Sequence, residues 1–154
     1  MYSKVKKGDK VAVAGVGGLG HMALQYMVKL GAEVTCFDIV EKKDACLALG
    51  AKEFVNVKNP RFNEFANTFN CIISTIPYQY DINDYRRMLK LGGEMAIVGL
   101  PSAKEKPLLD TTKILWDSKK KIYSSLIGGI KEMQEMLDFG VKYKIYPKVQ
   151  IIPK

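Results

Sequence analysis

A glycine-rich turn between an apolar run and a helical pattern constrains this chain more than any other feature. The run Val11–Ala14 leads into Gly15–Gly20, and apolar residues at helical spacing continue from His21 to Leu30. A buried strand that turns through glycines into a helix gathers backbone N–H groups and the positive end of the helix dipole at one point, where a diphosphate can bind. The turn provides five candidate coenzyme-binding residues: Gly15, Gly17, Gly18, Leu19 and Gly20.

The three spaced glycines have different expected roles. Gly15 permits the tight turn, Gly17 leaves room for a dinucleotide, and Gly20 lets the helix pack closely on the strand. This spacing alone is a weak signal, because a glycine-rich turn can also be only a turn. An acidic residue strengthens it, since a second strand, Glu33–Phe37, ends at Asp38, eighteen residues after Gly20. A carboxylate there can accept both hydroxyls of an adenosine ribose, so Asp38 is a further candidate.

Length and composition limit what this site can belong to. A chain of 154 residues is expected to form one domain, here a dinucleotide-binding domain over residues 1–154. No apolar run approaches the roughly 18 residues of a membrane span, and Met1–Lys4 lacks the apolar stretch of a signal peptide, so we expect a cytoplasmic protein without a membrane partner. Three widely spaced cysteines suit neither disulfides nor a zinc cluster, and we interpret Cys36, Cys46 and Cys71 as reduced core residues.

The net charge of +8 raises the alternative of a nucleic-acid-binding protein. However, the lysines are spread over the whole chain, arginine occurs only as Arg61, Arg86 and Arg87, and aromatic residues are not interleaved with runs such as Lys119–Lys121. A basic surface that attracts an anionic dinucleotide explains the charge more simply, so no nucleic-acid partner is expected.

Strand and helix patterns alternate along the chain. Apolar runs predict six strands: Val11–Ala14, Glu33–Phe37, Glu53–Val57, Cys71–Ser74, Met95–Val98 and Ile122–Ile127. Helices are expected at His21–Leu30, Glu41–Leu49, Asn83–Leu91 and Ile130–Tyr143, weaker helices at Phe62–Phe69 and Thr111–Trp116, and Val149–Ile152 could form a short final strand. Because each crossover returns the chain to the same end of the sheet, we predict an α/β fold with a doubly wound, parallel six-stranded sheet of Rossmann type, in the order 3-2-1-4-5-6.

Two of these helices carry an apolar stripe. The stripe of the first helix contains Leu19, Ala23, Tyr26, Met27 and Leu30. The stripe of the last helix contains Ile130, Met133, Met136, Leu137 and Val141. Stripes at this spacing are typical of helices that pack on a core.

In a sheet of this order the strand ends line one edge, with a crevice between strands 1 and 4. Four segments, in matching order, resemble the coenzyme-binding domain of zinc-dependent medium-chain alcohol dehydrogenases, especially the branch of cinnamyl and mannitol alcohol dehydrogenases. These segments are Gly8–Ala23, Ile73–Pro77, Val98–Pro101 and Ser125–Glu132. The resemblance covers nearly the whole chain.

The resemblance implies further coenzyme contacts. Those near the ribose and phosphate would be Ser74 and Thr75, and those near the nicotinamide would be Gly99, Leu100, Leu126 and Ile127. Members of this branch that prefer NADP have small hydroxyl residues at the end of the second strand and a following lysine for the 2′-phosphate. This chain keeps the lysine, Lys43, but has Asp38 in place of the hydroxyl residue. Because a carboxylate repels a 2′-phosphate and binds a free 2′-hydroxyl, we expect NAD in preference to NADP.

The resemblance also implies an activity. The parent enzyme would transfer hydride between a nicotinamide coenzyme and an alcohol or aldehyde, with its zinc held on a GroES-like catalytic domain. The zinc ligands of the family are missing from this sequence, so we expect no metal site, no catalytic residue and no activity of this chain alone; His21 is interpreted as a helix-end residue. The family further implies a homodimer in which the edge strands Ile122–Ile127 pair antiparallel.

Two other functions stay open on the sequence. A stand-alone sensor or regulatory module could bind NAD without chemistry, and the full reading frame would distinguish it from an enzyme. A methyltransferase uses the same glycine turn and ribose acid, but the late antiparallel hairpin of that family is not expected here.

Overall fold

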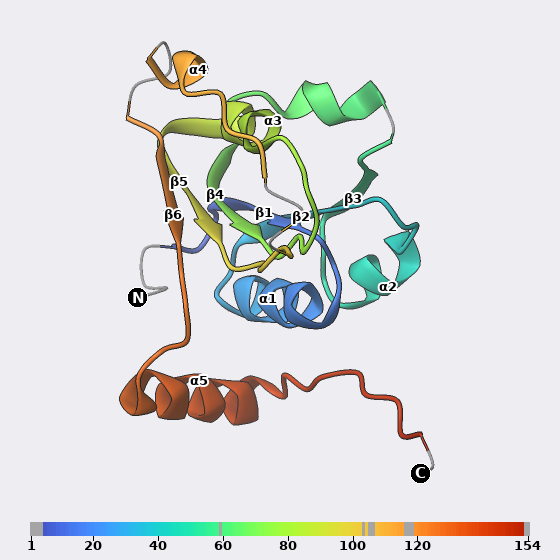
Figure 1. Cartoon of the computed structure of the whole chain (residues 1–154). Helices are drawn as coiled ribbons and strands as arrows, with labels where there is room; N and C mark the ends of the chain where they lie inside the picture. Colours follow the sequence, from blue (N-terminus) through green and yellow to red (C-terminus); the bar gives the residue numbers. More distant parts are fainter. Residues whose placement is uncertain (1–4, 59, 103, 105–106, 116–118, 153–154) are drawn as a thin grey trace.

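Six parallel strands form one sheet in the computed structural model of the chain (Figure 1). The structure describes residues 5–58, 60–102, 104, 107–115 and 119–152. The strands are β1 (Lys10–Ala14), β2 (Glu33–Asp38), β3 (Glu53–Asn56), β4 (Phe69–Ser74), β5 (Leu89–Ile97) and β6 (Lys121–Ser124). Their order, β3-β2-β1-β4-β5-β6, with each neighbouring pair parallel, confirms the predicted doubly wound fold.

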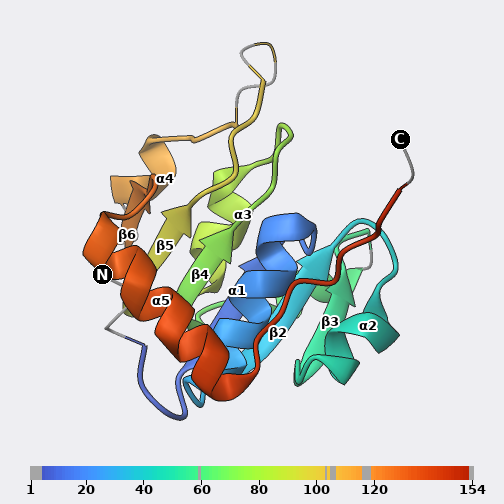
Figure 2. The ribbon, with the colours of Figure 1, turned by 90° about the horizontal axis from the view of Figure 1, so that it is seen from below.

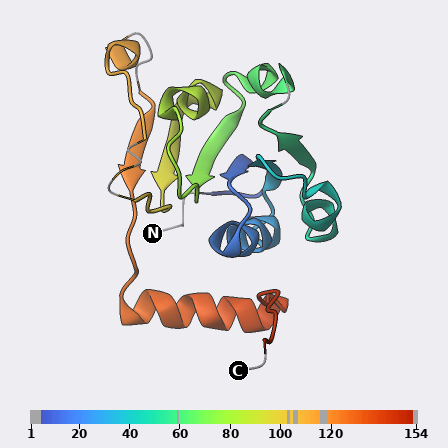
Figure 3. The ribbon, with the colours of Figure 1, turned by 45° about the vertical axis from the view of Figure 1, so that its right-hand side comes forward.

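Helices lie on both faces of the sheet (Figure 3). One face carries α1 (Gly18–Lys29) and α2 (Lys43–Ala48). The other carries α3 (Ile82–Met88), α4 (Thr112–Leu115) and a 3₁₀ helix (Pro60–Phe65). The last helix, α5 (Ile130–Tyr143), lies beyond α1, on the side away from the sheet. Within the described ranges, every helix is too short or too polar to cross a membrane.

The core has two halves, one on each face of the sheet. Val11 and Val13 of β1 pack on the side of α1 and α2, while Ala12 and Ala14 pack on the other side. All four side chains are fully buried, as expected for a strand in a parallel sheet that is covered on both faces. Phe37 of β2 centres the second half through edge-on ring contacts with Phe62, Phe65, Phe69 and Tyr85.

The connection between β4 and β5 differs from the prediction. The helix expected at Asn83–Leu91 ends three residues early, and β5 begins directly after it, six residues before its expected start. Leu89 already pairs with Phe69, and the next pair is Cys71 with Glu94. Two residues along β4 therefore correspond to five residues along β5. Gly92 and Gly93 lie in this bulge, so the two glycines interrupt a strand rather than end a helix. Phe69, the expected end of the preceding helix, opens β4 instead.

The C-terminal part also departs from the prediction. The strand expected at Ile122–Ile127 is confined to Lys121–Ser124, because its partner β5 ends opposite that point. The strand expected at Val149–Ile152 is wrong, since this segment has no regular secondary structure and lies on the far side of α1 and α2 from the sheet (Figure 1). The helix expected at Thr111–Trp116 is present as α4, although Trp116 lies outside the described residues.

The apolar stripe predicted for the first helix is confirmed in part, because Met27 is buried and Ala23 and Leu30 pack partly against the core. The residues of α1 that are buried are Gly20, Leu24 and Met27, whereas Leu19 is 64% exposed. The buried set follows a helical i, i+4, i+7 spacing that shares Met27 with the predicted stripe and is otherwise rotated by one position. The close approach of Gly20 to the sheet sets this rotation, and Ala23 packs only partly against the core.

The apolar side of α5 is open to solvent. This open face of α5 consists of Ile130, Met133, Met136, Leu137 and Val141. Tyr26 holds the helix to α1, because its ring stacks on Phe139 with a centroid separation of 5.8 Å and its hydroxyl donates to the Met136 carbonyl at 3.0 Å. The contact therefore lies on a different side of α5 from its apolar stripe.

Candidate coenzyme-binding site

The glycine turn lies at the C-terminal end of β1, where both neighbouring strands hold it. Gly15 has a φ of +83°, which other residues rarely adopt, and its N–H donates to the Phe37 carbonyl of β2 at 2.8 Å. From the other side, the Thr75 hydroxyl donates to the Gly15 carbonyl at 2.7 Å. A Cβ on Gly20 would overlap that carbonyl oxygen, so only glycine lets α1 approach the strand this closely.

Gly17 and Gly18 form the open side of the turn. A Cβ at either position would have no neighbour within 4 Å. Gly17 is the N-cap of α1, and the first turn of the helix, Gly18–His21, contains no acidic side chain. The first helical hydrogen bond runs from the His21 N–H to the Gly17 carbonyl at 3.0 Å, so the N–H groups of Gly18, Leu19 and Gly20 have no partner inside the helix. The turn is therefore a cradle that fits an anion such as a diphosphate.

Asp38 ends β2 beside this cradle. Its Oδ2 accepts hydrogen bonds from the Val16 N–H at 2.8 Å and Lys42 Nζ at 3.0 Å, and its Oδ1 accepts one from the Val40 N–H at 3.0 Å. Burial would raise the Asp38 pKa, but the two backbone N–H bonds and the Lys42 ammonium together lower it below its ordinary value. A carboxylate offers about four acceptor positions, about two on each oxygen. Oδ1 accepts only the bond from Val40, so about one of its positions remains for a ribose hydroxyl.

Lys42, rather than Lys43, faces the turn. Besides its bond to Asp38, Lys42 Nζ donates to the Val16 carbonyl at 2.8 Å, which connects the carboxylate with the loop. Lys43 begins α2 with an exposed side chain and lies outside the neighbouring pocket. The sequence prediction missed Lys42, because two adjacent lysines do not reveal which of them points toward the strand ends. A contact between Lys43 and the coenzyme stays a prediction.

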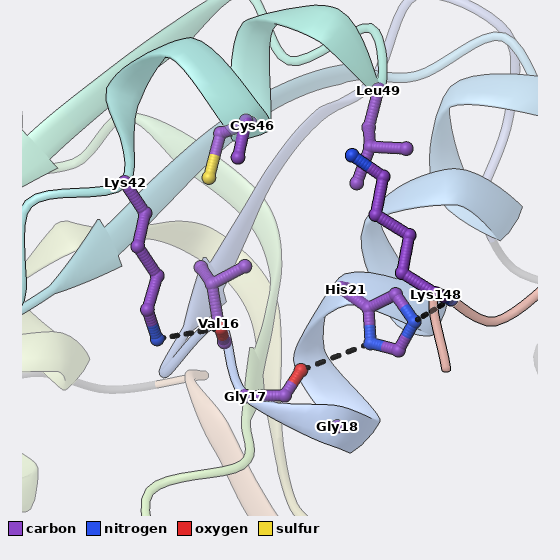
Figure 4. Close-up of a pocket in the computed structure, with 9 residues that line it drawn as sticks. Val16, Gly17, Gly18, His21, Lys42, Cys46, Leu49 and Lys148 are labelled. Atoms are coloured by element: carbon purple, nitrogen blue, oxygen red, sulfur yellow. Dashed lines mark hydrogen bonds between the residues drawn. The ribbon is translucent and has the colours of Figure 1, made fainter. Parts of the chain in front are cut away.

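A pocket of about 260 Å³ opens beside the turn, between α1 and α2 (Figure 4). Three parts of the chain form its walls, namely the turn with the start of α1, the helix α2, and the segment after α5. The lining residues are Val16, Gly17, Gly18, His21, Lys42, Ala45, Cys46, Leu49 and Lys148. Figure 4 shows Lys42 and Lys148 on opposite sides of the pocket.

His21 connects the turn with the segment after α5. Its Nδ1 lies 3.1 Å from the Gly17 carbonyl oxygen, and its Nε2 accepts a hydrogen bond from the Lys148 N–H at 3.3 Å. These partners assign the tautomer, with the proton on Nδ1 and the lone pair on Nε2. His21 lies in the first turn of α1, as predicted, but its contact with a residue 127 positions away has no sequence signal.

The remaining predicted site residues are either packed inside the sheet or exposed. Ser74 is fully buried and its hydroxyl donates to the Tyr80 hydroxyl at 2.9 Å. Gly99 lies so close to the Ile76 carbonyl that a Cβ would overlap the oxygen. Beyond the ends of β5 and β6, three residues are almost fully exposed: Leu100, Leu126 and Ile127. Contacts of these residues and of Thr75 with a coenzyme stay predictions.

Zinc does not fit the described part of the chain. No group of three or more Cys, His, Asp or Glu side chains in the described ranges is placed to bind a metal ion. Cys36, Cys46 and Cys71 are buried and free, which confirms that they are core residues. Burial raises the pKa of Cys71 to about 12, which keeps its thiol protonated in the core.

Known proteins are similar to this chain in sequence and fold. The profile of a family described as zinc-binding dehydrogenase matches residues 18–142. The chain is 39% identical over 150 residues to a probable formaldehyde dehydrogenase from Bacillus subtilis, covering 96% of this chain and 42% of the relative. It is 37% identical over 147 residues to an NADP-dependent alcohol dehydrogenase from Mycolicibacterium smegmatis, covering 94% of this chain and 41% of the relative.

A solved structure is also similar to this chain in sequence and fold. The structure described as CAD from Helicobacter pylori complexed with NADP(H) matches with a TM-score of 0.89 and 45% identity, over 98% of this chain and 43% of that one. The chain therefore spans less than half the length of these relatives. Their names favour a dehydrogenase over a regulatory module, and the all-parallel pairing of the described strands does not suit a methyltransferase.

Proposed function

Since the chain belongs to the zinc-binding dehydrogenase family, we propose that it binds a nicotinamide dinucleotide as the coenzyme-binding part of an alcohol dehydrogenase-like oxidoreductase. The shape of the glycine turn carries this proposal. Gly15 and Gly20 fit closely against each other, while Gly17 and Gly18 leave open space at the start of α1. The diphosphate of a dinucleotide suits this cradle, because backbone N–H groups and the helix dipole favour an anion there.

The acceptor position left on Asp38 supports NAD as the preferred coenzyme. A ribose 2′-hydroxyl can donate to Oδ1, whereas a 2′-phosphate would meet a carboxylate whose lowered pKa keeps it ionised. Lys42 pairs with this carboxylate and reduces the repulsion, and two of the relatives are described with NADP. We therefore propose a preference for NAD of about tenfold rather than exclusion of NADP.

The chain would contribute binding and orientation to the reaction. In such an oxidoreductase the coenzyme carries the hydride to or from the alcohol or aldehyde. The glycine turn would hold the diphosphate, Asp38 would select the adenosine ribose, and the backbone of the exposed residues Leu100, Leu126 and Ile127 would support the nicotinamide. The described residues offer no donor set for zinc, so we propose that zinc is held outside this chain and that the chain alone has no dehydrogenase activity.

Calorimetric titration with NAD and NADP tests coenzyme binding and selectivity. We expect the protein to bind both coenzymes, and Asp38→Asn to bring their dissociation constants to within about threefold of each other. Glu41→Gln removes the same charge from an exposed position three residues further on, and its ratio of dissociation constants should stay that of the wild type. Failure of the folded protein to bind either coenzyme would overturn the proposed function. An unchanged ratio in Asp38→Asn would overturn the NAD preference alone.

We also propose that two copies of the chain pair along β6, which forms one edge of the sheet. The Ser125 N–H donates to the Ile97 carbonyl of β5 at 3.0 Å. Because successive residues of a strand point their N–H groups in opposite directions, the Ser124 N–H points toward the open edge. An antiparallel partner strand could accept from it.

Light scattering of two Ser124 variants tests this dimer. Ser124→Pro removes a donor that faces outward without removing a bond to β5, so we expect a monomer. Ser124→Ala keeps the N–H and should remain a dimer. A monomeric wild-type protein at high concentration, or a dimeric Ser124→Pro protein, would overturn the proposal.

A cytoplasmic location is the last part of the proposal. Cys36, Cys46 and Cys71 are buried as free thiols, and thiols are kept reduced in the cytosol. Cell fractionation should recover the protein with cytosolic markers, and its recovery from the medium would contradict this location.

A further inference from the structure

Two hydrogen bonds hold the segment after α5 across the edge of the pocket. The Gln25 side-chain amide donates to the Tyr146 carbonyl at 3.2 Å, and the Lys148 N–H donates to His21 Nε2 at 3.3 Å. His21 and Gln25 are four residues apart and therefore lie on one side of α1. Ile145, where the segment begins, is buried. We call residues 145–148 the strap, and Figure 2 shows the chain passing over α1 toward α2 at this point.

The strap brings the Lys148 side chain over the pocket. In Figure 4 this side chain extends from beside His21 toward Leu49, which follows α2. On the opposite side, the Lys42 ammonium already bonds to Asp38 and to the Val16 carbonyl. The hydrogen bonds and ion pairs of the described residues include none to the Lys148 ammonium. Among the described residues, the charge of Lys42 in the pocket is thus paired with a carboxylate, whereas the charge of Lys148 is not.

We propose that Lys148 binds a phosphate group of the coenzyme, and that His21 and Gln25 are positioning residues that hold the strap in place. This inference rests on the proposed function, because it takes a dinucleotide to occupy the glycine turn. The pocket shares Val16, Gly17 and Gly18 with that turn and Lys42 with the end of β2. The phosphate is either the diphosphate bridge or a 2′-phosphate, since an ammonium ion binds both as charged hydrogen-bond acceptors.

Titration of Lys148→Met with NAD and NADP tests the contact. Methionine keeps an unbranched side chain and removes the charge, so we expect at least one coenzyme to bind about fivefold more weakly. Equal losses for both coenzymes assign Lys148 to the diphosphate, and a loss for NADP alone assigns it to the 2′-phosphate. Lys58→Met is the matched control, because Lys58 is exposed after β3 and outside the pocket.

The outcomes separate this inference from the proposed function. If the wild type binds coenzyme and Lys148→Met binds as tightly as Lys58→Met, the role of Lys148 is overturned and coenzyme binding stands. If the folded wild type binds neither coenzyme, both proposals fail.

Gln25→Leu tests the positioning role. Loss of its bond to the Tyr146 carbonyl should loosen the strap and weaken coenzyme binding about threefold in the wild-type background. In the Lys148→Met background the same change should have no further effect, because the strap then carries no charge to position. Equal losses in both backgrounds would show that Gln25 acts through the helix itself and would overturn the positioning role.

Discussion

The helices α1 and α5 both carry an apolar stripe, yet only α1 packs that side against the sheet. Leu24 of α1 has no exposed surface, whereas Leu137 of α5 is 51% exposed. α1 packs against β1, β2 and β4, while α5 is held to α1 by Tyr26. The comparison shows that an apolar stripe identifies the side of a helix that can be buried, and that the neighbouring surface determines whether it is buried.

The two ends of the candidate site differ in the same way, because one is packed against the sheet and the other is exposed. The turn at the start of α1 is held by the hydrogen bond that the Gly15 N–H donates to β2 and by the one that the Gly15 carbonyl accepts from Thr75, directly after β4. On the side of α5, the residues expected near the nicotinamide, Leu126 and Ile127, are almost fully exposed. Substitutions on the α1 side should therefore affect stability far more than those on the α5 side.

The largest effect is expected at the contact between α1 and the glycine turn. Gly20→Ala would place a Cβ on the Gly15 carbonyl oxygen, and we expect it to lower the free energy of unfolding by about 4 kcal/mol. Gly18→Ala lies two residues away with no atom near its Cβ, so it should be neutral or slightly stabilising. Urea unfolding of both variants measures the difference. Equal stabilities would contradict the close approach at Gly20.

A matched pair of leucine substitutions compares the two helices directly. Leu24→Ala should destabilise the protein by about 3 kcal/mol, because it removes a fully buried side chain from the core. Leu137→Ala on the open face of α5 should change the free energy of unfolding by less than about 0.5 kcal/mol. Comparable losses in the two variants would mean that the open face of α5 is covered in solution.

Local sequence signals account for the parts of the fold that could be predicted. The run Val11–Ala14, the glycine turn and Asp38 lie close together in the sequence, and they define the central strand and the adenosine side of the site. The bulge in β5 has no such signal, because it depends on how Leu89 pairs with Phe69 of another strand. The rotation of α1 likewise follows from a contact with the sheet.

Long-range contacts explain what the prediction of the site missed. The pairing of Lys148 with His21 joins positions 127 residues apart, and no spacing rule reports such a contact. The family resemblance implies that Ser74 lies near the coenzyme, a contact that stays a prediction, while in the structure its hydroxyl donates to the Tyr80 hydroxyl. A polar residue at a strand end can thus complete the packing of the sheet as readily as it can face a ligand.

Low pH should reduce the stability of the α1 side of the molecule, because it protonates Asp38. Since its folded pKa is lowered, the carboxylate contributes stability that is fully present above its unfolded pKa of about 3.9 and is lost as the pH falls through the folded value. We expect Asp38→Asn to cost about 2 kcal/mol near neutral pH, because the carboxylate accepts charge-assisted hydrogen bonds.

Unfolding at a series of pH values checks the sign of this effect. The difference between the wild type and Asp38→Asn should stay constant down to about pH 4 and shrink below it. Glu41→Gln, which removes an exposed acid nearby, should follow the wild type throughout. A difference that already declines above about pH 5 would contradict the lowered pKa of Asp38.

The smallest effect is expected where the two helices meet. Tyr26→Phe removes the hydrogen bond from the Tyr26 hydroxyl to the Met136 carbonyl but keeps the ring that stacks on Phe139. We expect a loss of about 1 kcal/mol that is confined to the docking of α5, so amide hydrogen exchange should accelerate about fivefold in α5 and remain unchanged in α1. Tyr143→Phe removes a hydroxyl at the end of α5 and serves as the control. Equal acceleration in α1 and α5 would show that the two helices open together, which would contradict the prediction that α5 undocks while α1 stays packed on the sheet.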